Sequence, residues 1–289
     1  MKATSIALGF FDGVHIAHQK IIKAAVDFAA KNSLSPIVLS FDKSPLEILC
    51  PEKVRYITTL STKQEIIEKL GAKAEFLTVS EDFLNMPPEE FIQEVLIGKY
   101  NAKHVVCGYD YRFGKDGKGD TSLLTEMGKK LGFSVEILDC EILWGEKISS
   151  SRIRDLITYG EMEKANELLG RKFSLKGTVC EGKHLGRTLG FPTANVFFDK
   201  LTVIPRKGVY KTTVITDGKK YSAITNTGIN PTVGGEALRT ETYIPDFEGN
   251  LYEKNITIEF NDFIREEKKF ESIEELKLQI KKDVDSLKR

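Results

Sequence analysis

The chain has 289 residues, with 42 Lys and Arg set against 42 Asp and Glu. This length predicts two domains, each large enough to bury a core of its own. Because the net charge is zero, we expect no non-specific nucleic-acid binding and no basic surface for a membrane. The apolar run at the N-terminus is too short for a signal peptide, and no stretch reaches the length that spans a bilayer. The sequence therefore predicts a cytoplasmic protein.

The first half of the chain alternates apolar strands with amphipathic helices. Strands are expected at 5–11, 36–41, 75–79, 103–107 and 134–138, and helices at 15–32, 63–71, 87–96 and near 123–131. In the first helix, Ile21, Ala25 and Phe28 would share one helical face. Strands separated by helices imply right-handed crossovers, so this half predicts an open, Rossmann-like parallel α/β fold.

After Arg171 the pattern changes to short strands that are broken by glycines. They are expected at 174–180, 208–215, 220–227 and 255–260, with an Asp217-Gly218 hairpin turn between two of them. This half predicts an antiparallel barrel or sandwich. A final helix begins with a capping box of Ser272 and Glu275. Its apolar stripe, expected to pack on the barrel, is Ile273, Leu276, Ile280, Val284 and Leu287. The predicted domains are 1–171 and 172–289.

The four cysteines are scattered, at Cys50, Cys107, Cys140 and Cys180. They form no CxxC pair, and no histidine lies near them at the spacing of a zinc site. We interpret them as small buried apolar residues in a reducing compartment.

The stretch GFFDGVHIAH, residues 9–18, contains two of the four histidines. A strand, a tight Asp12-Gly13 turn and a helix that begins near His15 bring together backbone N–H groups and the positive end of a helix dipole. Such a point binds phosphate. His15 and His18 would project from it in one direction and donate hydrogen bonds to a phosphate chain. Taken in isolation, an H-x-x-H pair is more often an ordinary surface feature of a helix start.

Three serines, Ser149, Ser150 and Ser151, open a later helix and are followed by Arg152 and Arg154. Hydroxyl groups, a helix N-terminus and guanidinium groups suit a polyphosphate. In isolation this stretch is also compatible with a plain N-cap and solvated arginines. Together with the two histidines, it predicts a shared triphosphate site.

A glycine-rich stretch in the second half, GKHLGRTLGFPTANV at residues 182–196, offers another place for phosphate. Its glycines would allow close backbone approach, and Lys183 and Arg187 would supply charge. It is not a Walker A loop, because no Gly-Lys-Ser/Thr run opens a helix. From spacing alone, the glycines are more often turns and bulges of a β domain.

These stretches resemble the motifs of one family, the bacterial bifunctional riboflavin kinase/FMN adenylyltransferases, or FAD synthetases. Residues 9–19 are similar to the H-x-G-H signature of nucleotidyltransferases, and 148–171 to the second such signature. GYDYRFGKDGKGD, at 108–120, resembles the family's loop near the flavin and nucleotide. Residues 182–196 and RTETYIPDFEGNLYE, at 239–253, resemble the kinase signature and the segment with its catalytic Glu. The resemblance covers essentially the whole chain.

The resemblance implies an enzyme that makes FMN in its C-terminal domain and FAD in its N-terminal domain. Its small-molecule partners would be riboflavin, FMN and ATP, with Mg²⁺ as cofactor. In the kinase step, Glu241 would take the proton from the riboflavin 5′-hydroxyl as that oxygen attacks the γ-phosphorus. The Thr193 hydroxyl and the Asn195 carbonyl would hold Mg²⁺. In the second step, an FMN phosphate oxygen attacks the α-phosphorus of ATP and pyrophosphate leaves.

The resemblance also implies the remaining site residues. The other catalytic groups would be His15, His18, Ser150 and Arg154. The residues that would bind ATP or flavin are Gly9, Phe11, Asp12, Gly108, Asp110, Phe113, Ser151, Gly182, Lys183, Gly186 and Arg187.

Two departures from the family pattern concern the adenylyl site, and two smaller ones, at Glu181 and Glu253, lie in the kinase half away from the residues assigned to chemistry. Ala17 stands where the family has Gly between the two histidines, and Ser44 where it often has His before a proline. An alternative is therefore a riboflavin kinase whose adenylyltransferase domain is weak or inactive. A third interpretation is a flavin- or nucleotide-binding regulatory protein whose barrel contacts RNA, which the zero net charge disfavours.

Overall fold

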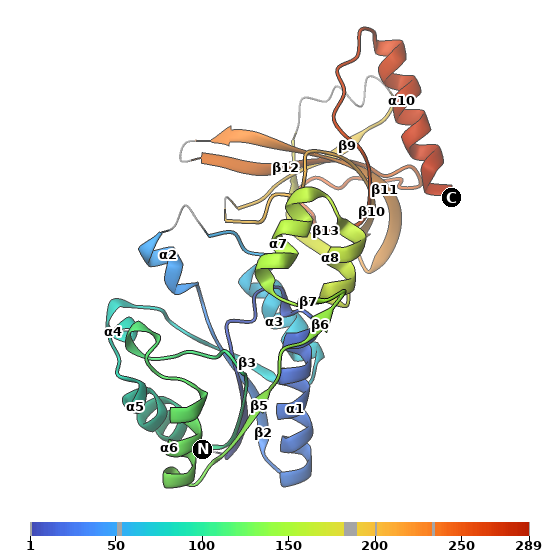
Figure 1. Cartoon of the computed structure of the whole chain (residues 1–289). Coiled ribbons are helices and arrows are strands. Elements are labelled where there is room, and N and C mark those ends of the chain that lie inside the picture. Colours follow the sequence, from blue (N-terminus) through green and yellow to red (C-terminus); the bar gives the residue numbers. More distant parts are fainter. Residues whose placement is uncertain (1, 51–53, 182–189, 200, 233–234, 289) are drawn as a thin grey trace. The chain divides into compact units, whose positions relative to one another are not determined.

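The structure, a computed structural model, describes residues 2–50, 54–181, 190–199, 201–232 and 235–288 (Figure 1). The chain forms two compact units. The first consists of Met1–Val54 and Thr59–Ser150, and the second of Arg55–Thr58 and Ser151–Arg289. The boundary predicted after Arg171 lies further along the chain than this division, and it stays a prediction.

The first unit is built on a five-stranded parallel sheet with the order β3-β2-β1-β4-β5. Its strands are β1 (Thr4–Leu8), β2 (Ser35–Phe41), β3 (Lys73–Leu77), β4 (Ala102–Gly108) and β5 (Ser134–Leu138). The α-helices are α1 (Ile16–Asn32), α2 (Pro45–Leu49), α3 (Leu60–Lys69), α4 (Glu81–Leu84), α5 (Pro88–Glu90) and α6 (Thr121–Leu131). A π-helix, Phe91–Lys99, follows α5 directly. A short hairpin, β6 (Ile142–Leu143) and β7 (Glu146–Lys147), follows β5. The predicted open α/β fold is confirmed.

Both faces of this sheet are buried. Successive side chains of a strand point to opposite sides, so each strand contributes to two core clusters. In β1, Ile6 and Leu8 pack in one cluster with Phe91, whereas Ala7 packs in another with Ile22 of α1. With both faces covered, functional groups lie at the strand ends, and open α/β folds bind ligands at the carboxyl ends.

The buried residues of helix α1 are Ile22, Ala25 and Ala29. Of the three residues predicted to share one face, Ala25 is buried and Ile21 packs, partly buried, against the same core cluster. The ring of Phe28 instead lies half-buried against the ring of His104 in β4, with 3.6 Å between the centroids. Apolar residues occupy adjacent positions of this helix, and the 3.6-residue period does not decide between them.

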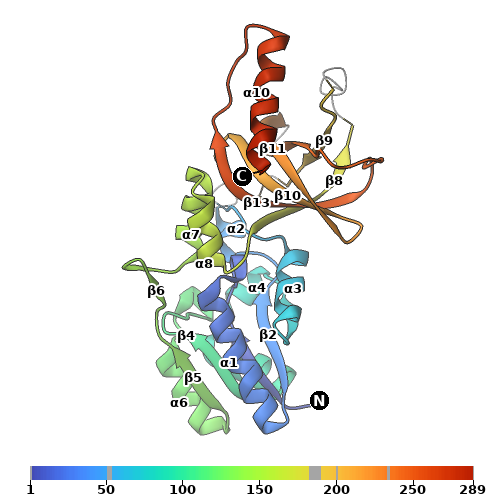
Figure 2. The same ribbon diagram turned by 90° about the vertical axis from the view of Figure 1, so that its right-hand side faces the viewer.

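The second unit is a closed barrel with the strand order β10-β11-β12-β9-β8-β13, seen from another side in Figure 2. The strands are β8 (Phe173–Cys180), β9 (Thr193–Phe197), β10 (Gly208–Thr216), β11 (Lys219–Thr232), β12 (Gly235–Tyr243) and β13 (Asn255–Arg265). The helices are α7 (Ser150–Tyr159), whose first residue belongs to the first unit, α8 (Met162–Leu169) and α10 (Ile273–Asp285). Of the two predicted β architectures, the barrel is therefore confirmed.

Two local features fix the register of the barrel. Asp217 and Gly218 both have positive φ, 48° and 74°, as a two-residue hairpin turn requires, and they join β10 to β11 as predicted. Inside the barrel the buried hydroxyls of Thr212, Thr225 and Thr242 form a chain, with oxygens 2.8 and 2.9 Å apart. The hydrogen-bonding need of each buried hydroxyl is thus met by a hydroxyl on the neighbouring strand.

The final helix departs from its prediction. Ser272 accepts a hydrogen bond from the Glu275 backbone N–H, but the Glu275 carboxylate accepts from Glu271 N and not from Ser272. The apolar stripe is not tightly packed, because Ile273 is 55% exposed and Leu276 and Ile280 are only half-buried. The residue of α10 that is buried is Asp283. Leu276 and Ile280 line a cavity, and a periodic pattern cannot distinguish a cavity wall from a packed core.

The cysteines are all free, but only Cys107 is buried. Cys50 and Cys140 are half-buried and Cys180 is exposed, so the expectation of burial is wrong for these three. In the part of the chain that the structure describes, no helix is both long and apolar enough to cross a membrane.

Candidate functional sites

The turn after β1 forms the framework of the first candidate site. It passes through Phe11, Gly13 and Val14, whose φ values of 55°, 77° and 40° are all left-handed. A Cβ on Gly9 would lie 2.9 Å from the Phe11 ring, so glycine is needed there for the ring to fold back. Phe11 is buried and meets the ring of His18 edge-on, with centroids 5.1 Å apart. The structure thus gives Gly9 and Phe11 a supporting role, and their contact with a ligand stays a prediction.

The two histidines stack on each other at the start of α1. Their ring centroids are 3.5 Å apart with 17° between the planes. His15 is the N-cap, and its Nδ1 accepts a hydrogen bond from the His18 backbone N–H at 3.3 Å. With Nδ1 used as an acceptor, the neutral His15 ring carries its proton on Nε2.

His18 lies in an environment that disfavours its charged form. Burial lowers its pKa well below the usual value, and the neighbouring His15 and Lys63 lower it further. Its Nδ1 is buried and has no hydrogen-bond partner among the described residues. A neutral imidazole with an unsatisfied ring nitrogen is suited to exchange a hydrogen bond with a ligand.

Lys63, which the sequence analysis did not identify, is buried beneath the same turn. Its Nζ donates to the carbonyls of Phe10 at 3.1 Å and Phe41 at 3.3 Å, and lies 3.4 Å from Ser40 Oγ. Burial lowers its pKa to about 8, although Asp12 and Asp42 act in the opposite direction. Lys63 joins the ends of β1 and β2. It precedes the buried Ile67 by four residues, and this spacing is the signal that could have found it.

Ser150, in the second predicted nucleotidyltransferase signature, contacts the first signature at Asp12. Its Oγ donates a hydrogen bond of 2.8 Å to the backbone carbonyl of Asp12, which is itself buried. Two residues 138 positions apart in the sequence are thereby joined. Ser151 and Arg154 belong to the second unit, where Arg154 Nη2 donates to Ser151 Oγ at 3.2 Å.

The loop predicted near the flavin begins at Gly108, the last residue of β4. Lys147 of β7 pairs with the exposed Asp110 and donates to the hydroxyl of Tyr109 at 2.9 Å. These hydrogen bonds raise the pKa of Lys147. Phe113 is buried in the core below the loop. Its direct contact with a ligand stays a prediction.

The second candidate site lies along strands β9 and β12. The antiparallel register places Thr193 opposite Tyr243, Asn195 opposite Glu241, and Phe197 opposite Arg239. Directly paired residues share a face of the sheet, about 5 Å apart. The residues predicted to bind metal and to act as base are therefore neighbours across one strand pair.

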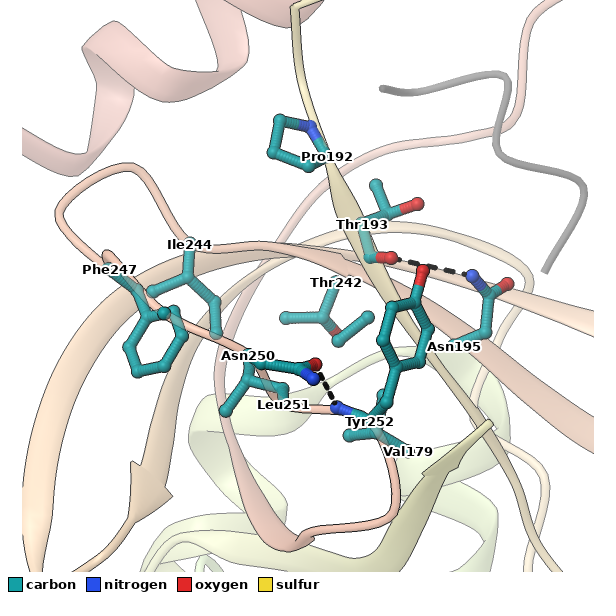
Figure 3. A pocket seen from close by; sticks show the side chains of 12 residues that line it. Val179, Pro192, Thr193, Asn195, Thr242, Ile244, Phe247, Asn250, Leu251 and Tyr252 are labelled. Carbon is teal, nitrogen blue, oxygen red and sulfur yellow. Dashed lines mark hydrogen bonds between the residues drawn. The ribbon is translucent and has the colours of Figure 1, made fainter. Parts of the chain in front are cut away.

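Two cavities adjoin this strand pair, and Thr193 lines both. The smaller, of about 330 Å³, is also lined by Asn195 and Thr242, and the segment from Ile244 to Tyr252 forms its other side (Figure 3). The larger, of about 550 Å³, contains Glu241 together with apolar side chains of the barrel and of α10. Its apolar residues are Phe191, Val209, Ile224, Phe270, Leu276 and Ile280.

Four predicted ligand-binding residues, Gly182, Lys183, Gly186 and Arg187, lie outside the described residues. Gly190, the first described residue after this segment, has a φ of 86°. Phe191 follows and meets the ring of Tyr243 edge-on. The described residues contain no group of three or more His, Cys, Asp or Glu side chains that could hold a metal.

Comparison with known proteins gives matches to both parts of the chain. Residues 1–152 match the family model described as FAD synthetase, and residues 169–289 match the one described as riboflavin kinase. Relatives from Listeria monocytogenes and Bacillus subtilis are each named bifunctional riboflavin kinase/FMN adenylyltransferase. They are 38% identical over 284 and 286 residues, covering 96% of this chain and 89% of each relative.

A crystal structure from Streptococcus pneumoniae, described as a macrolide-efflux protein, resembles the whole chain. It has a TM-score of 0.90 and 32% sequence identity, and the match covers 100% of this chain and 95% of that one. The likeness shows a fold shared over the full length of both chains.

Proposed function

The chain belongs to the family of bifunctional riboflavin kinases/FMN adenylyltransferases, and we propose which of its residues carry the two reactions. The protein phosphorylates riboflavin to FMN and transfers an adenylyl group from ATP to FMN, which gives FAD and pyrophosphate. The predicted enzyme class is confirmed, and the alternative of a kinase with a weak or inactive adenylyltransferase domain has no support.

We assign adenylyl transfer to the first unit. An FMN phosphate oxygen attacks the α-phosphorus of ATP, so the enzyme has to position the reactants and stabilise charge, with no covalent intermediate. The neutral His15 would donate from Nε2 to the phosphate chain, and His18 stacks beside it. Ser150 and Lys63 would hold the turn that carries the pair. The roles predicted for Ser151 and Arg154, which belong to the second unit, stay predictions.

We assign the kinase reaction to the second unit, and the pairing of Asn195 with Glu241 is the observation that carries this proposal. Glu241 would accept the proton of the riboflavin 5′-hydroxyl as that oxygen attacks the γ-phosphorus. The larger cavity has the apolar lining that suits an isoalloxazine ring. The smaller cavity, with Thr193 between the two, would take ATP.

Mg²⁺ is the metal that we propose for the kinase site. The donors there are a hydroxyl and an amide carbonyl, both hard oxygen ligands. Two neutral protein ligands leave the remaining positions to phosphate and water, as Mg²⁺ prefers. Asn195 Oδ1 already accepts a hydrogen bond from the guanidinium group of Arg239, so this oxygen faces positive charge. When bound, the ion would neutralise the phosphate oxygens of ATP.

The proposal is tested by resolving FMN and FAD over time in a reaction with riboflavin, ATP and Mg²⁺. We expect Glu241→Gln to lower FMN formation by about 10²–10⁴-fold, the range for loss of a general base. FAD formation from supplied FMN should stay near the wild-type rate. Glu259→Gln, a change in a partly exposed carboxylate on β13 that pairs with Lys220, is the matched control. Wild-type kinase activity in Glu241→Gln would refute the assignment.

A further inference from the structure

Arg239 occupies the space between the two groups that the kinase proposal requires. Its Nη2 donates to Asn195 Oδ1 at 2.8 Å and also to the Glu241 carboxylate. The guanidinium carbon lies 5.7 Å from the centroid of the Phe197 ring. The Arg239 side chain is 22% exposed, and that of Glu241 is 41% exposed. One cation therefore contacts both the proposed metal ligand and the proposed base.

The strand register explains why a single side chain reaches both oxygens. Arg239 and Glu241 are two residues apart on β12, so they point to the same side. Asn195 is paired directly with Glu241, and the residue opposite Arg239 is Phe197. The ring of Phe197 thus supports the guanidinium group, whose planar shape suits both stacking and paired acceptors.

The contact with Asn195 cannot coexist easily with a bound divalent cation. A metal on Asn195 Oδ1 would lie within a few ångströms of the guanidinium group, and two like charges at that distance repel. The present position also leaves the buried Nε of Arg239 without a hydrogen-bond partner among the described residues. A buried donor without a partner is unfavourable, so this arrangement is not the best that the side chain could make.

We infer that Arg239 is a resident cation of the kinase site, which pairs with Asn195 and Glu241 before the metal and nucleotide bind and is displaced from Asn195 when they do. The inference rests on the proposed function, in which Asn195 ligates the metal. Arg239 acts through these two residues, so it is a positioning residue. Its charge keeps the two oxygens together, and the same charge competes with the metal.

The test is a titration of the full chain with Mn²⁺ at saturating ADP, with the free ion followed by electron paramagnetic resonance. Arg239→Gln removes the charge and keeps polar N–H groups. We expect it to bind Mn²⁺ about three- to tenfold more tightly, the effect of losing one partly exposed charge pair. The adenylyl site is the same in every variant, so differences between titrations report on the kinase site.

Arg206→Gln is the matched control. Arg206 makes the same kinds of contact elsewhere in the second unit, with the Glu266 carboxylate and, at 4.8 Å, with the ring of Phe263. Its loss should leave Mn²⁺ affinity within about twofold of wild type. If Arg239→Gln binds Mn²⁺ as wild type does, or more weakly, the inference is wrong.

Two further variants separate the possible causes. Arg239→Lys keeps the charge, so we expect nearly wild-type Mn²⁺ affinity, and tightening equal to that of Arg239→Gln would overturn the inference. Arg239→Lys also decides the question if Arg239→Gln does not fold. Asn195→Ala tests the underlying proposal, because unchanged Mn²⁺ affinity in that variant would remove Asn195 as a ligand. If Asn195→Ala binds Mn²⁺ more weakly but Arg239→Gln does not bind it more tightly, the role of Arg239 is refuted and the role of Asn195 as a ligand stands.

Discussion

The imidazole rings of His15 and His18 lie face to face, 3.5 Å apart, in the first turn of α1. Two rings at this distance cannot both be protonated without strong repulsion, and burial already lowers the pKa of His18. The pair is therefore suited to donating hydrogen bonds as neutral groups. Fixed donors of this kind stabilise a phosphate chain more strongly in the transition state, where its charge increases, than in the ground state.

We expect His18→Ala to lower FAD formation from supplied FMN by about 10²–10³-fold, the usual effect of removing one donor that stabilises developing charge. His15→Ala should act in the same direction, because it removes both a donor and the N-cap of α1. Kinase activity in the same samples is the internal control. If both variants make FAD at the wild-type rate, the pair is only a helix start.

The sequence predicted this pair because the motif, the turn and the helix start are all local. It did not identify Lys63, although Lys63 contacts the same turn, because that contact joins residues 53 positions apart. It predicted Gly9 and Phe11 as ligand contacts, which stays a prediction, and it did not reveal that the Phe11 ring folds back over Gly9. A motif marks residues that a site requires, but it does not separate those that touch the ligand from those that support the turn.

In the second unit, too, local features were predictable from the sequence and contacts between distant residues were not. The Asp217-Gly218 turn was predictable because two residues with positive φ are enough to specify it. Closure of the barrel depends on β10 pairing with β13, which no local pattern reveals. For α10 the periodic pattern identified Leu276 and Ile280 as apolar positions on one side of the helix, but they line a cavity and not a packed core.

Lys63 should give the first unit a distinctive response to alkaline pH. Its pKa is lowered to about 8, so between about pH 8 and 10.5 the unfolded chain binds a proton that the folded chain has lost. Stability rises with pH where the unfolded state binds more protons. From pH 8 to 9.5 this group should therefore raise the free energy of unfolding by about 2 kcal/mol, and Lys63→Met should lack that rise.

The measurement is urea unfolding at the two pH values, followed by the fluorescence of Trp144, the only tryptophan, which lies in the first unit. Lys69→Met, a change in an exposed lysine of the same helix, is the control. Equal pH responses in wild type and Lys63→Met would show that the burial of Lys63 has no such effect.

The pairing of Asp283 with Arg265 should control riboflavin binding. Asp283 in α10 accepts from Arg265 Nε at 3.1 Å and from Nη2 at 2.7 Å, which holds the helix to β13. Asp283→Asn keeps the shape but removes the charge, so α10 should loosen over the larger cavity. We expect the KM for riboflavin to rise about tenfold with a smaller change in kcat, since Glu241 is untouched. Asp285→Asn, on the exposed side of α10, should change neither constant, and an unchanged KM in Asp283→Asn would contradict the prediction.

The last prediction concerns where the kinase part of the chain can be cut. Asn166 of α8 donates to the Phe260 carbonyl at 2.9 Å and accepts from the Phe173 N–H at 2.5 Å, both in the barrel. A fragment of residues 172–289 leaves these two buried groups without their partner, whereas one of residues 151–289 keeps it. We expect the longer fragment to be a stable kinase that makes no FAD, and the shorter one to be less stable by at least about 2–3 kcal/mol. Asn166→Ala in the longer fragment should reproduce most of that loss in urea unfolding. Equal stability of the two fragments would show that the barrel needs neither Asn166 nor α8.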